Sequence, residues 1–151
     1  MTDAYVTKRP GVDEFLEFLS LKIEIVVFTA GLKEYASLVL DAQDRKRGIS
    51  HRMYRDSRWE MDGNYVKDLS EMGRDSRRVM VVDDKPSLYV FQPENVIPVR
   101  PFVDDLGDRV LWLSIEFFDD VVGFEGTRDA VNLFASSRRY LFIYFQNYKL
   151  D

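Results

Sequence analysis

The stretch Arg77-Arg78-Val79-Met80-Val81-Val82-Asp83-Asp84-Lys85-Pro86 indicates how this 151-residue chain is expected to fold. Four consecutive apolar residues, three of them Val, are typical of a strand buried on both faces in a parallel sheet. Pro86 ends the segment, because proline cannot continue a hydrogen-bonded ladder. Ligands of open parallel sheets bind just beyond the carboxyl ends of the strands, where Asp83 and Asp84 come. Paired carboxylates there suit Mg²⁺, although an acidic turn after a core strand is the alternative for this motif alone.

The composition is ordinary for one globular domain, with 46% hydrophobic and 31% charged residues. The net charge of −5 gives no overall positive field, so direct nucleic-acid binding is not expected. The chain has no Cys and one His, His51, which excludes disulfides, thiolate nucleophiles and two-His metal sites. No run reaches the ~20 apolar residues of a membrane span and no signal-peptide pattern opens the chain, so no membrane partner is expected.

A strand followed by a small-residue turn and a helix precedes that stretch. The strand is predicted over residues 23–28, the turn is Thr29-Ala30-Gly31, and the helix runs from about Leu32 to Ala42. The amides of such a turn and the helix N-terminus point at one spot and can bind an anion, and Thr29 adds a hydroxyl. A purely structural turn remains the alternative, since many strand-to-helix turns look alike.

The remaining segments complete an α/β pattern. Asp62-Gly63 predicts a hairpin turn, whose second strand delivers Lys67 just before the chain turns again. A short strand is predicted over Val96–Val99 and a helix over about Arg109–Val121. The alternation of strands and helices predicts a mainly parallel sheet.

Four segments then line up in a known order: Lys8–Leu16, Val27–Gly31, Gly63–Ser70 and Val81–Pro86. From about Tyr5 to Val131 the chain resembles the small C-terminal-domain phosphatases, also called NLI-interacting-factor-like, and among them the plant-type proteins. These are protein serine phosphatases of the haloacid dehalogenase superfamily that act on the tail of RNA polymerase II. The resemblance implies a Rossmann-like fold with a parallel central sheet and a small β-hairpin. It implies a phosphatase-like domain over residues 1–134, incomplete at its N-terminus, followed by an apolar tail of unknown role over residues 135–151.

The resemblance also assigns roles to individual residues. Thr29 matches the hydroxyl that holds a phosphate oxygen, and Lys67 the lysine that neutralises the phosphoryl group. Asp84 matches the position that binds Mg²⁺, while Asp83 supports it through water or by orienting Lys67. Substrate binding falls to five residues: Ala30, Gly31, Leu32, Tyr35 and Arg55. Leu32 and Tyr35 match residues lining an apolar pocket beside the phosphoserine. The implied partners are phosphoserine-containing segments such as the RNA polymerase II tail, and the implied location is nuclear, with cytoplasmic as the alternative.

The chain departs from the family in one respect. The family's attacking aspartate belongs to a D-x-D-x-T/V motif on a strand ahead of the Lys-Arg-Pro segment, and no two aspartates in this chain are spaced two apart. Loss of a covalent nucleophile costs on the order of 10⁶ in turnover, so the chain alone is predicted not to hydrolyse phosphomonoesters. The sheet is also expected to lack its central strand, between the strands ending at Phe28 and Val82. The apolar run Tyr140–Phe145 either fills that position or packs loosely, as the product of a truncated or mis-spliced reading frame.

Three functional hypotheses follow. The first is a Mg²⁺-dependent protein serine/threonine phosphatase domain, a phosphoric monoester hydrolase by resemblance, of which this chain is an incomplete form. The second is a non-catalytic relative, or pseudophosphatase, that binds phosphorylated segments through Thr29, Arg55 and Lys67. The third is a relative of the mitochondrial import subunit that shares this domain, although Phe28–Gly31 and Asp83–Asp84 follow the phosphatases more closely.

Overall fold

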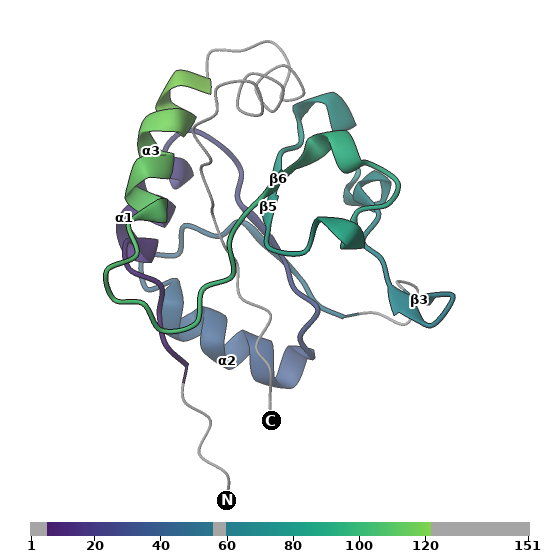
Figure 1. The fold of residues 1–151 in the computed structure, drawn as a ribbon, viewed down its shortest axis with the longest axis horizontal. Coiled ribbons are helices and arrows are strands. Elements are labelled where there is room, and N and C mark those ends of the chain that lie inside the picture. The colour runs from purple at the N-terminus through teal and green to yellow at the C-terminus, as the bar shows by residue number, and fades with distance from the viewer. Residues whose placement is uncertain (1–5, 56–59, 122–151) are drawn as a thin grey trace, which may run out of the picture.

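The structure, a computed structural model, describes residues 6–55 and 60–121, with side chains as far as Asp119 (Figure 1). Residues 135–151, including the Tyr140–Phe145 run, lie outside the described residues. Three helices and six short strands are formed: α1 Val12–Ser20, β1 Val26–Phe28, α2 Lys33–Gln43, β2 His51–Met53, β3 Glu60–Met61, β4 Asn64–Tyr65, β5 Val81–Asp83, β6 Val96–Pro98 and α3 Val110–Val121. Among these described helices, none is long and apolar enough to cross a membrane.

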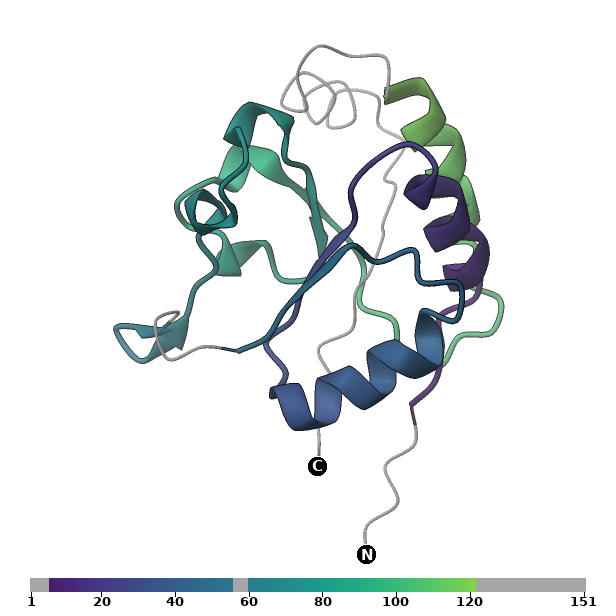
Figure 2. The same cartoon turned by 180° about the vertical axis from the view of Figure 1, so that it is seen from behind.

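The described strands form three separate pairs. β1 pairs with β2 in parallel, with Val27 opposite Arg52, and β5 pairs with β6 in parallel, with Val82 opposite Ile97. β3 and β4 form the predicted antiparallel hairpin. Figure 2 shows the β1–β2 pair from behind, with α2 running beneath it. Within residues 6–55 and 60–121, β1 and β5 therefore belong to different two-stranded sheets.

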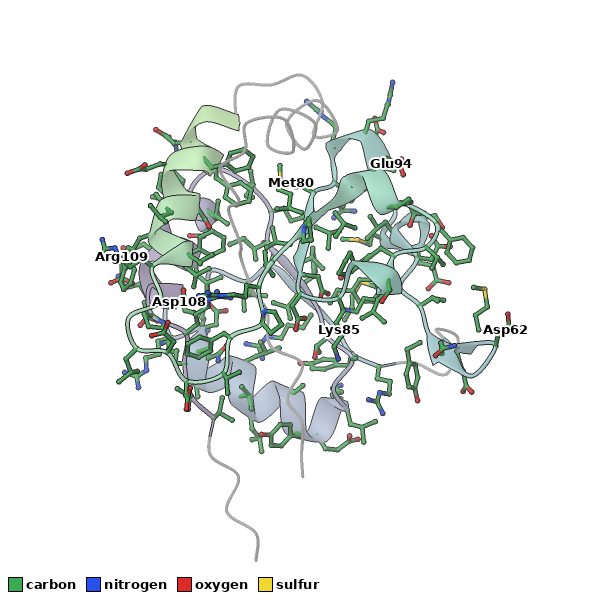
Figure 3. The ribbon with its side chains drawn as sticks, viewed as in Figure 1. Asp62, Met80, Lys85, Glu94, Asp108 and Arg109 are labelled. Carbon is green, nitrogen blue, oxygen red and sulfur yellow. The ribbon has the colours of Figure 1, made fainter. Side chains whose placement is uncertain are left out.

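The main core lies where α1 and α3 pack side by side, as Figure 1 shows. Phe15 of α1 and Phe118 of α3 meet edge to face, with their ring centroids 5.8 Å apart. Gly11 allows this approach: its φ is +87°, and a Cβ there would meet the Trp112 side chain of α3 at 3.0 Å. Met80 and Val82 pack against the same core, which joins the helices to the β5–β6 pair (Figure 3).

A buried ion pair fastens the N-terminal segment to the start of α3. Arg9 Nη2 lies 2.7 Å from Asp108 Oδ2, and both side chains are 2% exposed. Burial alone would raise the pKa of Asp108, but hydrogen bonds from Arg9 and from the Val110 amide hold it below its ordinary value. Asp108 is therefore both the cap of α3 and the partner of a residue near the other end of the chain.

The hairpin turn has the predicted geometry. Asp62 and Gly63 both have positive φ, 52° and 77°, as a two-residue turn between antiparallel strands requires. The hairpin projects from the body, with Asp62 far from Asp108 and Arg109 on the opposite side (Figure 3). After β4 the chain turns inward, so that Lys67 becomes buried.

The decisive strand differs from its predicted form in two ways. β5 covers Val81–Asp83, later than the predicted Val79–Val82, and its two valines are half-buried. Asp83 is instead the fully buried residue of the strand, at 4% exposure. The physical reason is that β5 has a described neighbouring strand on one side only, β6, so its valines are less enclosed than those of a central strand.

Candidate active site

The Lys67 ammonium lies between the carboxyl ends of β1 and β5. Its Nζ donates to the Phe28 carbonyl at 2.6 Å, to Asp83 Oδ2 at 3.0 Å and to the Tyr89 hydroxyl at 3.2 Å. The side chain is 2% exposed. Burial lowers the pKa of Lys67, and the neighbouring Asp83 only partly offsets this. An ammonium has three protons, so these three acceptors match its full donor capacity.

Tyr89 is the functional residue that the sequence did not reveal. Its hydroxyl donates to Asp83 Oδ2 at 2.7 Å, the oxygen that also accepts from Lys67. Burial, followed by the charge of Asp83, raises the pKa of Tyr89 well above its ordinary value. Within the apolar run Leu88–Phe91, Tyr89 resembles an ordinary core residue. The available signal was Pro86, which starts the single helical turn Pro86–Leu88 and brings the chain back over Asp83.

The two aspartates have opposite surroundings. Asp83 is fully engaged, since its Oδ1 also accepts from the Lys85 amide at 3.0 Å. Asp84 has a buried Oδ1 with no hydrogen-bond partner in the described part of the chain. Burial, with Asp83 beside it, raises the pKa of Asp84 to about 6. A buried carboxylate oxygen without a donor is costly unless it is protonated or binds a cation.

Asp84 fits the predicted role of metal ligand only in part. Its orphaned Oδ1 suits one contact to a hard cation such as Mg²⁺. However, within residues 6–55 and 60–121 no group of three or more acidic or histidine side chains is placed to hold a metal. The described residues fit a single ligand position and do not form a complete site.

The turn after β1 brings Thr29 and Arg55 together. Thr29 is buried, and its Oγ1 accepts from the Gly31 amide at 3.0 Å, so its own proton remains to be donated. Arg55 is exposed, and its Nε donates to the Ala30 carbonyl at 2.6 Å while its backbone amide donates to the Gly31 carbonyl at 3.1 Å. The Arg55 guanidinium stacks over the ring of Tyr65 in β4, with 4.6 Å from Cζ to the ring centroid.

Leu32 and Tyr35 lie at the start of α2 and differ in exposure. Leu32 is 57% exposed, and Tyr35 is half-buried. Their role as the lining of an apolar pocket stays a prediction. A polar cavity of about 580 Å³ lies elsewhere, between the end of α2 and β2, and contains none of the predicted site residues; it is lined by Asp41, Asp44, Arg45, Arg47, Ile49 and Arg52.

The structure thus brings most predicted site residues to one place, at the carboxyl ends of β1 and β5. Lys67 contacts Phe28, the residue before Thr29, and also contacts Asp83, the residue before Asp84. The residues in this place are a buried cation, a buried hydroxyl, an orphaned carboxylate oxygen and an exposed guanidinium. These are the groups that phosphoryl recognition requires.

Comparison with known proteins defines the class. The sequence model of the NLI interacting factor-like phosphatase family matches residues 1–129. The chain belongs to this family. It is 48% identical over 124 residues to a Dictyostelium discoideum protein named "Probable C-terminal domain small phosphatase", covering 82% of this chain and 40% of that protein. It is 44% identical over 117 residues to human "Carboxy-terminal domain RNA polymerase II polypeptide A small phosphatase 1", covering 78% and 45% respectively.

Solved structures agree on the fold. The structure of Fcp1, described as an essential RNA polymerase II CTD phosphatase, matches with a TM-score of 0.56 at 24% identity, covering 89% of this chain and 36% of that one. Fission yeast Fcp1 bound to beryllium fluoride matches with a TM-score of 0.54 at 19% identity, covering 94% and 43%. The fold is therefore the α/β fold of the haloacid dehalogenase type. The chain spans less than half the length of these relatives.

Proposed function

We propose that this chain recognises phosphoserine-containing protein segments and does not hydrolyse them on its own. Its lineage is that of a Mg²⁺-dependent protein serine/threonine phosphatase acting through an aspartyl-phosphate. The observation that supports recognition best is the position of Arg55. Its Nε is fastened to the Ala30 carbonyl, which leaves the two Nη nitrogens of an exposed guanidinium beside the Thr29–Gly31 turn. A fork of this kind pairs with a phosphate in two parallel hydrogen bonds.

Thr29 and Lys67 support the same proposal in different ways. The Thr29 hydroxyl has a proton to donate to a phosphate oxygen. Lys67 is fully bonded to protein acceptors, so it contributes positive charge from within and contacts no phosphate in this arrangement. Binding without turnover follows, because the chain has no D-x-D pair to supply the attacking carboxylate.

Mg²⁺ belongs to this proposal as a weakly held ion. Asp84 Oδ1 would give it one contact, and a bound phosphate would have to supply further oxygen ligands. Calorimetric titration with Mg²⁺ alone should therefore give little heat, and a phosphoserine peptide present in excess should strengthen Mg²⁺ binding. Equal Mg²⁺ affinity with and without the peptide would contradict this.

The proposed substrate class and place follow from the relatives. One human relative is named for polypeptide A of RNA polymerase II, so we propose phosphoserine segments of the RNA polymerase II tail as partners and the nucleus as the location. Neither a membrane nor nucleic acid is a proposed partner.

Calorimetry with a phosphoserine peptide and its unphosphorylated form tests recognition. The phosphorylated peptide should bind at least ~10-fold more tightly, and Arg55→Gln should remove that preference. Arg109→Gln is the matched control, because Arg109 is an exposed arginine stacked on Trp112, away from the site. Equal binding of the two peptides, or equal losses in the two variants, would remove the proposal.

Turnover is tested separately, by phosphate release from p-nitrophenyl phosphate with Mg²⁺. The expected rate is that of the buffer. A Mg²⁺-dependent rate that disappears with Asp84→Ala would show that the chain is an active phosphatase, which is the leading alternative.

A further inference from the structure

The described part of the chain leaves a lane between two strands that run in the same direction. β1 has β2 as its described neighbouring strand, and β5 has β6. At the carboxyl ends, Lys67 joins the Phe28 carbonyl to Asp83. At the amino ends, both guanidinium nitrogens Nε and Nη2 of Arg74, which precedes β5, lie 2.8 Å from the carboxylate of Glu24, which precedes β1. Side chains thus connect β1 and β5 at both ends, and no backbone pairing does so among the described residues.

The surroundings of this lane determine what can occupy it. Val27 of β1 is 3% exposed and Ile97 of β6 is 1% exposed, so the flanking strands lie in the interior. The core between α1 and α3 packs against Val82 from one side. A segment placed between β1 and β5 would therefore be covered on both faces, which requires a run that is apolar throughout and uncharged.

We propose that Tyr140–Phe145 of this same chain occupies the lane as a strand parallel to β1 and β5. The run is Tyr-Leu-Phe-Ile-Tyr-Phe, six aliphatic or aromatic residues without a charge, Gly or Pro. Aromatic and β-branched residues favour strands, and six of them extend for about 20 Å. Arg138-Arg139 before it and Lys149 after it mark the ends of the segment that tolerates burial.

The connection is long enough. Residues 122–139 separate the end of α3 from the run, and an extended chain of that length reaches about 60 Å. A domain of this size is about 35 Å across, so the run can reach the lane within its own molecule. The result would be a five-stranded parallel sheet in the order β2, β1, Tyr140–Phe145, β5, β6. This proposal does not depend on phosphate binding.

Proximity can be tested in the full chain, which contains no native cysteine. Val82→Cys combined with Phe142→Cys should be joined by a short bismaleimide within one molecule, as measured by peptide mass spectrometry. The control pairs Phe142→Cys with Val103→Cys, which is 72% exposed in the loop before α3, and should react at least ~10-fold less. Equal yields in the two pairs would overturn the proposal. Cross-linked dimers would overturn it too, since the occupant would then be a second copy of the chain.

Burial on both faces gives an independent test. Phe142 and Ile143 would point to opposite faces of the sheet, so Phe142→Asp and Ile143→Asp should each lower the thermal midpoint by about 10 °C or more. Tyr148→Asp, beyond the run, should leave the midpoint unchanged. A loss in only one of the two variants would place the run on a surface, and a loss in neither would place it outside the fold. Either result would overturn the proposal.

Discussion

The two ends of the lane between β1 and β5 are joined by ion pairs of similar length and very different surroundings. At the carboxyl end, Lys67 and Asp83 are 3.0 Å apart, with side chains 2% and 5% exposed. At the amino end, Arg74 and Glu24 are 2.8 Å apart, with side chains 49% and 39% exposed. Distance alone would rank the two pairs as equals. Burial separates them, because a charge stranded in the interior costs far more than one stranded in water.

Lys67→Met should have the largest effect. It leaves the Asp83 carboxylate buried with Tyr89 and the Lys85 amide but without its cation. Loss of one partner of a buried pair costs about 3–5 kcal/mol of unfolding free energy, measurable by urea denaturation. A loss below ~1 kcal/mol would mean that solvent reaches Asp83 and that the contrast between the two ends is smaller than the burial indicates.

A paired replacement sharpens this test. Lys67→Met combined with Asp83→Asn removes both charges, so it should recover a substantial part of the stability lost in Lys67→Met alone. If the double variant is less stable than the single one, the Asp83 hydrogen bonds matter more than its charge.

Tyr89→Phe should come next. It removes one hydrogen bond to Asp83 and one acceptor for Lys67 while keeping the ring, at a cost of about 1–3 kcal/mol. Tyr65→Phe is the control, because Tyr65 is exposed on the hairpin, and it should stay near wild type. Equal denaturation midpoints for Tyr89→Phe and wild type would show that the tyrosine hydroxyl does not hold the buried network together.

Arg74→Gln should have the smallest effect, and that effect should depend on salt and pH. Arg74, with His51, holds the pKa of Glu24 down at about 2, against an ordinary 4.5. The folded state thus favours the carboxylate, so this stabilisation is present above about pH 4.5 and is lost as the pH falls toward 2. The stability difference between wild type and variant should shrink over that interval and at about 1 M salt. A difference that persists at both extremes would assign Arg74 a role other than ion pairing.

The sequence predicted the parts of the fold that local rules determine. The positive φ values of Asp62 and Gly63 follow from the turn itself, and α2 differs from its expected range by one residue at each end. The register of β5 could not be predicted, because Val79–Val82 reads as one continuous apolar run. Which part of it pairs depends on Val96–Pro98, a strand that comes later in the chain.

For the candidate site, the sequence identified residues better than it identified their bonds. Lys67, Asp83 and Thr29 do gather at the ends of β1 and β5. A motif cannot show which acceptors a lysine takes, and in this fold the Phe28 carbonyl and the Tyr89 hydroxyl join the expected carboxylate. Tyr89 was missed for the same reason, since its polar end matters only after the turn at Pro86 has folded.

The Arg9–Asp108 pair has a consequence for how the molecule assembles. Its partners are 99 positions apart in the sequence. The N-terminal segment can therefore be fixed only after nearly all the intervening chain has been synthesised and a very large loop has closed. Contacts of such sequence separation slow folding. Until α3 emerges, the side chain of Arg9 remains without the carboxylate that accompanies it into the interior.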